Sequence, residues 1–84
     1  MKNKLLIKVY VVSLSLEFDI YIPVNESIKM VIELIVKTIS ELSDNRLKED
    51  VKYCLFDSET NTLYNYASIV RDTNINNGKK LFLV

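Results

Sequence analysis

The sequence has 84 residues, and its 11 basic and 11 acidic side chains give a formal net charge of zero. It contains no His, one Cys and one Gly, which excludes His-dependent catalytic triads, glycine-rich phosphate loops and zinc sites. A neutral chain without a basic block also lacks the positive field that nucleic-acid binding requires. We therefore expect one domain over residues 1–84 that is not an enzyme, needs no cofactor or metal, and acts through its surface.

The N-terminal region is typical of a β-hairpin. Leu5–Val12 is rich in β-branched residues, with Lys8 as its only charge, and Ser13–Glu17 can form a turn. In Phe18–Pro23 the apolar residues then alternate with the others, a period of two that indicates a half-buried strand. Pro23 has no backbone N–H to donate, so the strand is expected to end near it.

The apolar start of the chain also resembles a secretion signal, but its details argue against one. Lys8 interrupts the apolar run, no small-residue cleavage site follows, and Glu17 and Asp19 come next. No apolar stretch reaches the roughly 18 residues that a membrane-spanning helix needs. We expect a cytoplasmic protein that does not insert into membranes.

A single helix is predicted after the hairpin. Asn25–Ser27 supplies a side-chain acceptor that can cap the helix and a carboxylate close to its positive end. Ser43–Asn45 is expected to end the helix after about 15 residues. Helical spacing places one apolar stripe on it: Ile28, Val31, Ile32, Ile35, Ile39 and Leu42. Met30 and Leu34 lie off this stripe, where broader core contact is favoured over a second contact surface.

The rest of the chain predicts three further strands. Val51–Phe56 reads as the third strand, Asp57–Asn61 as a turn and Thr62–Tyr66 as a short edge strand. Asn76–Gly78 marks a tight turn before the last strand, Lys79–Val84. The order β-β-α-β-β-β predicts an α+β fold with one helix packed on one face of a mixed sheet. The first and last strands are expected to pair in parallel at its centre.

This order is that of the β-grasp, or ubiquitin-like, fold. Ile22–Ile28 resembles the strand-to-helix segment of ubiquitin, and Val70–Leu83 resembles the family's apolar-x-Asp-x-x-Ile-x-x-Gly-x-x-Leu-x-Leu pattern. The resemblance implies buried side chains on both sides of one turn at Gly78. The residues expected in the core are Val70, Ile75, Leu81 and Leu83.

Within the ubiquitin-like proteins, the sequence is most similar to the YukD/EsaB family of Gram-positive type VII (WXG100, or Ess) secretion systems. Phe18–Ile22 and Ile28–Ile35 resemble the second strand and helix of that family, and Ile75–Leu83 resembles its ending. Two features depart from the family pattern. Lys79 stands where an acidic residue is common, and the stretch 57–67 is longer than the family's usual loop. The resemblance implies a non-catalytic accessory or regulatory protein whose partner is a secretion component.

The end of the sequence bears on how such a protein acts. Conjugated ubiquitin-like proteins and sulfur carriers end in Gly-Gly, whereas this sequence ends in Leu83-Val84. We therefore expect neither conjugation nor sulfur transfer, but non-covalent protein binding.

Residues on the outward face of the sheet are the candidates for that binding. If Ile7 and Leu81 face the core, alternation turns other apolar residues of the first and last strands outward. The candidate surface comprises Leu6, Tyr10, Leu55, Phe82 and Val84, with Tyr53 as an alternative to Leu55. Ubiquitin binds most partners through the corresponding face, and by resemblance Phe82 and Val84 stand at positions that contribute to it.

Other interpretations of these residues stay open. Outward apolar side chains can reflect β propensity alone, and a generic β-grasp interaction module or a homodimer built on this face would present the same residues. Cys54, the single cysteine, is expected to be buried and structural, because no cationic cluster is evident near it that would activate its thiol.

Overall fold

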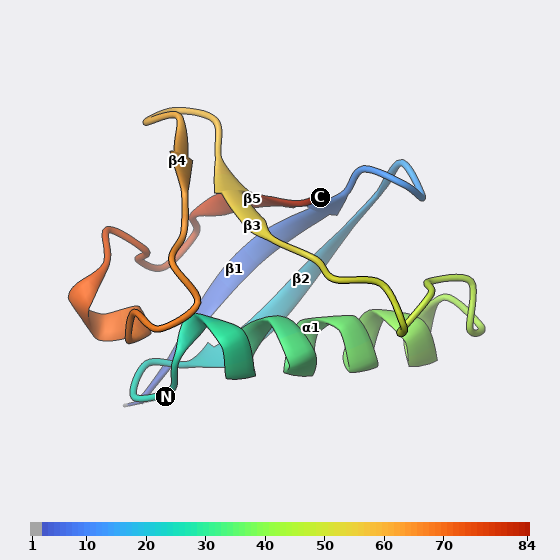
Figure 1. Cartoon of the computed structure of the whole chain (residues 1–84), viewed down its shortest axis with the longest axis horizontal. Helices are drawn as coiled ribbons and strands as arrows, with labels where there is room; N and C mark the ends of the chain where they lie inside the picture. Colours follow the sequence, from blue (N-terminus) through green and yellow to red (C-terminus); the bar gives the residue numbers. More distant parts are fainter. Residues whose placement is uncertain (1–2) are drawn as a thin grey trace.

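The computed structural model describes residues 3–84, which form one five-stranded sheet, one α-helix and one short 3-10 helix (Figure 1). In chain order the elements are β1 (Lys4–Val11), β2 (Leu16–Pro23), α1 (Ile28–Leu42), β3 (Leu55–Asp57), β4 (Thr62–Leu63), η1 (Val70–Asp72) and β5 (Lys80–Leu83). The predicted order and the α+β class are confirmed.

The sheet has the strand order β2-β1-β5-β3-β4. β1 pairs with β2 in antiparallel and with β5 in parallel, so that Val9 lies between Phe18 and Leu81. The parallel pairing of the first and last strands at the centre is therefore as expected. β1 and β2 are the longest strands, and their apolar alternation buries five residues on the helix side: Ile7, Val9, Val11, Ile20 and Ile22.

Helix α1 crosses one face of the sheet, as Figure 1 shows. The Ser27 hydroxyl accepts a hydrogen bond from the Met30 amide at 3.2 Å, which satisfies one of the free N–H groups of the first turn. The predicted stripe is buried except at its end: Leu42 is 64% exposed, since the last turn extends past the core. Val36 is buried in addition. Met30 and Leu34 are exposed, so the expectation of core contact for them was wrong.

The third and fourth strands are much shorter than the sequence predicts. β3 begins only at Leu55, because Val51 and Lys52 lie outside the sheet and are exposed to solvent. Cys54 exchanges two backbone hydrogen bonds with Val84 at 2.9 and 3.0 Å, and this pair continues the ladder by one position. The predicted edge strand ends at Leu63, after which the chain turns inward.

The C-terminal pattern takes the conformation that the resemblance implies. Gly78 has a φ of +82°, a left-handed conformation that favours glycine, and its amide donates to the carbonyl of Leu6 at 2.8 Å. The four residues expected in the core are buried: Val70, Ile75, Leu81 and Leu83. Within residues 3–84, no helix is long and apolar enough to cross a membrane.

Candidate protein-binding surface

Three aromatic side chains form a row across the sheet, on the face opposite the helix. Tyr10 lies opposite Phe82, and Phe82 lies opposite Phe56 on its other side. Residues paired in this way share one face of a sheet. The rings of Tyr10 and Phe82 meet edge to face, with centroids 5.6 Å apart, which is a favourable aromatic geometry. We call Tyr10, Phe56 and Phe82 the aromatic row.

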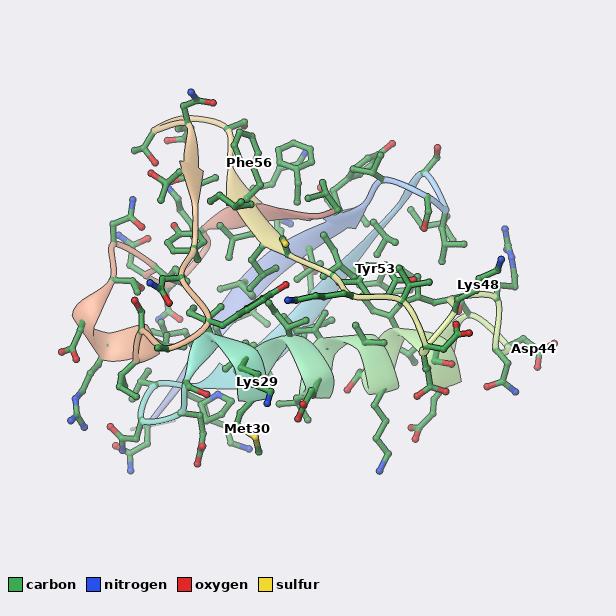
Figure 2. The ribbon with its side chains drawn as sticks, viewed as in Figure 1. Lys29, Met30, Asp44, Lys48, Tyr53 and Phe56 are labelled. Atoms are coloured by element: carbon green, nitrogen blue, oxygen red, sulfur yellow. The ribbon has the colours of Figure 1, made fainter. Side chains whose placement is uncertain are left out.

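Phe56 takes the place that the sequence analysis assigned to Leu55 or Tyr53. Leu55 is fully buried, because its register partner is the core residue Leu83, and Tyr53 is buried as well. In Figure 2, Tyr53 lies between the sheet and the helix, whereas Phe56 projects from β3 on the side away from the helix. Leu55 is therefore not part of the candidate surface, and Phe56 is an aromatic residue of that surface that the sequence analysis missed.

Exposed apolar residues widen the aromatic row. Leu63 lies opposite Phe56 on β4. Leu6 and Tyr21 lie opposite each other on the same face, but Lys8 and its partner Asp19 separate them from the aromatic row. Val84 follows Phe82 by two positions and is half exposed. Leu63, Val84 and the aromatic row together are called the outer patch. A contiguous apolar patch of this kind is typical of an interaction site.

Charged side chains of β1, β2 and β5 border the outer patch. The Lys80 ammonium lies 5.6 Å from the ring centroids of both Tyr10 and Phe82, a favourable cation–π arrangement, and pairs with Glu17 at 3.3 Å. Lys8 pairs with Asp19, also at 3.3 Å. An apolar centre with a charged rim is the usual composition of a protein–protein interface.

A buried polar cluster stabilises β3 behind this surface. The carboxylate of Asp57 has no solvent exposure and lies 2.9 Å from the ammonium of Lys79. Its oxygens also accept hydrogen bonds from the Thr60 hydroxyl at 2.8 Å, the Glu59 amide at 3.1 Å and the Asn74 amide group at 3.2 Å. The cluster thus ties the β3–β4 turn to the loop that precedes β5.

These contacts shift the acidity of both charged partners. The hydrogen bond from Lys79 lowers the pKa of Asp57 to about 2, against the opposing effect of burial. The hydrogen bond to Asp57 raises the pKa of Lys79 above its ordinary value. Lys79 was noted in the sequence only as a departure from the family pattern. The structure shows that its partner is the buried carboxylate of Asp57.

A groove of about 580 Å³ separates α1 from the segment that leads into β3. Ile32, Val36, Tyr53 and Tyr66 contribute its apolar surface, and lysine and glutamate side chains surround it. The thiol of Cys54 lies 3.2 Å from the Tyr66 hydroxyl and is partly exposed, so the expectation of a buried cysteine was wrong. Within residues 3–84, no three His, Cys, Asp or Glu side chains group closely enough to hold a metal ion.

Comparisons with known proteins identify the fold. No protein-family model matches the chain, and a search of curated proteins finds no match either. Among solved structures, the EccD5 ubiquitin-like domain from Mycobacterium xenopi is similar with a TM-score of 0.77 and 10% identity, over 98% of this chain and 93% of that one. The ubiquitin-like domain of the Mycobacterium tuberculosis type VII secretion system protein EccD1 has a TM-score of 0.71 and 12% identity, over 96% and 97%.

A chain of the MycP5-free ESX-5 inner membrane complex is also similar, with a TM-score of 0.77 and 8% identity over 98% of this chain. The match covers only 21% of that longer chain. The protein has the ubiquitin-like β-grasp fold. At identities of 8–12% these likenesses show the fold alone.

Proposed function

We propose that this protein is a non-catalytic accessory protein of a type VII secretion machine, related to the YukD/EsaB proteins. It acts in the cytoplasm by binding a secretion component non-covalently through the outer patch. The observation that carries the proposal is the aromatic row, in which Tyr10, Phe56 and Phe82 lie side by side on the face that the helix leaves open.

The physical basis of binding is the exposure of rigid aromatic surface. Aromatic side chains lose little conformational entropy when they are covered, and they dominate the energetics of many interfaces. The ion pairs at the rim, Lys80–Glu17 and Lys8–Asp19, are solvent-exposed and contribute little to stability. Their charges remain available to orient a partner. Similarity to ubiquitin-like domains of type VII proteins supports the choice of a secretion component as that partner.

The test is capture of partners from the native host by the wild-type protein and by the Phe82→Asp variant, with the captured proteins identified by mass spectrometry. We expect the wild type to retain a type VII component. The variant should retain at least about tenfold less of this component, because truncation of a hot-spot residue costs about 2 kcal/mol or more of binding free energy. Its circular dichroism and melting curve should stay close to those of the wild type.

Met30→Asp is the matched control, because Met30 is an exposed apolar residue on the helix rather than on the outer patch. It should leave capture unchanged. If Phe82→Asp and Met30→Asp capture equal amounts of the partner, the outer patch is not the binding site. If the wild type retains only proteins of another machine, the secretion assignment is wrong and the protein is an interaction module of that system.

A further inference from the structure

The two edges of the sheet differ in length. β4, at one edge, has two residues, whereas β2, at the other, has eight. Within residues 3–84, β2 pairs with β1 alone, so one side of its backbone has no strand partner. A long unpaired edge is a template for another strand.

The hydrogen bonds of β1 show which backbone groups of β2 face this edge. The amides of Lys8 and Val12 donate to β5 and its flank, at 2.9 and 3.3 Å, so alternate residues of β1 point away from β2. Asp19 lies opposite Lys8. Because the backbone groups of Lys8 point toward β5, the two residues do not exchange hydrogen bonds. The same alternation directs the N–H and C=O groups of Glu17, Asp19 and Tyr21 to the open edge. The amide of Val24 donates to the carbonyl of Asn3 at 2.9 Å, on the β1 side, so the even-numbered residues of this region face β1 and the odd-numbered ones face the open edge.

Most of the usual protections of an edge strand are absent from β2. It contains no lysine, its only proline is the last residue, and it pairs with β1 one to one without a bulge. Its two acidic residues, Glu17 and Asp19, are already paired with Lys80 and Lys8. Proteins that keep a long edge free blunt it in one of these ways.

We propose that the edge of β2 pairs in antiparallel with β2 of a second copy of this chain, about a two-fold axis at Ile20. On the helix side this pairing places Ile20 opposite itself and Phe18 opposite Ile22. On the outer side it places Asp19 opposite Tyr21, so no like charges meet. An axis at Asp19 would set two carboxylates directly opposite each other, which is destabilising.

Two further features favour a second copy as the occupant. The chain has zero net charge, so two copies do not repel each other at long range. On α1, the groove lies on one flank, beside Tyr53, and helical spacing puts Leu34 and Leu42 on the opposite flank, beside β2. They are 40% and 64% exposed, and a strand added to β2 would lie over that flank. The dimer would have one continuous sheet with both outer patches on one face.

The first test uses the wild-type protein alone. Sedimentation should show a monomer–dimer equilibrium, and amide hydrogen exchange should be followed at low and high protein concentration. We expect the amides of Asp19 and Tyr21 to exchange roughly tenfold more slowly, or slower still, in the dimer. The inward amides of Ile20 and Ile22 serve as internal controls and should be protected at both concentrations.

The second test removes one edge donor. Asp19→Pro deletes an N–H that β1 does not use, a change that edge strands tolerate, and should yield a folded monomer. Asp19→Asn removes the same charge but keeps the N–H, and should dimerise like the wild type.

A wild type that stays monomeric at millimolar concentration overturns the proposal. So does a dimer in which the Asp19 and Tyr21 amides exchange freely, because the contact then lies elsewhere. If Asp19→Pro does not fold, the exchange measurement on the wild type decides. Phe82→Asp should dimerise normally, which separates this inference from the proposed function of the outer patch.

Discussion

The two ends of the sheet are stabilised in different ways. At the β2–β1 end, two strands of eight residues pair one to one, and apolar alternation buries one side of each. At the β3–β4 end, the strands have three and two residues, and side-chain contacts to Asp57 join the turn between them to the loop before β5. Long strands thus rely on backbone pairing and the hydrophobic effect, whereas the short pair depends on a buried ion pair.

The largest effect is expected at the long-strand end. Ile7 is fully buried at the centre of the β1–β2 pair, so Ile7→Ala should lower the free energy of unfolding by about 2–5 kcal/mol. Chemical denaturation measures this. Val12→Ala, at an exposed position of the same segment, is the control and should change stability by less than about 0.5 kcal/mol. Equal effects at both positions would contradict the assignment of inward and outward faces.

A smaller but diagnostic effect is expected at the short-strand end. Asp57→Ala leaves the ammonium of Lys79 without its main partner, and Lys79→Met leaves the carboxylate of Asp57 buried without its cation. The double change should therefore lower the free energy of unfolding by less than the sum of the two single changes. Thermal melts of the four proteins form the cycle. Strict additivity would show that the pair does not stabilise β3.

The smallest effect is expected from acid. Asp57 has a pKa of about 2 in the folded protein, against an ordinary value of 3.8, so folding favours its charged form. Its contribution is complete above about pH 4 and is lost as the pH falls toward 2. Denaturation midpoints across this range should fall less steeply in Asp57→Asn than in the wild type. Parallel profiles would exclude Asp57 as the source of the acid sensitivity.

The candidate surface could be predicted in part. Alternation along β1 and β5 identified Leu6, Tyr10, Phe82 and Val84 correctly as residues outside the core, because both strands have a clear period of two. On the third strand the prediction of Leu55 failed. The run from Val51 to Phe56 has apolar residues on both faces of a strand, so its alternation does not say which face is buried.

The order of elements, the cap and buried stripe of α1, and the turn at Gly78 could all be predicted from the sequence, because each depends on residues close together in the chain. The position of Phe56 in the aromatic row and the ion pair between Asp57 and Lys79 became visible only in the folded structure. Both contacts join segments that are distant in sequence. Their geometry follows from the register between β3 and β5, which local periodicity does not specify.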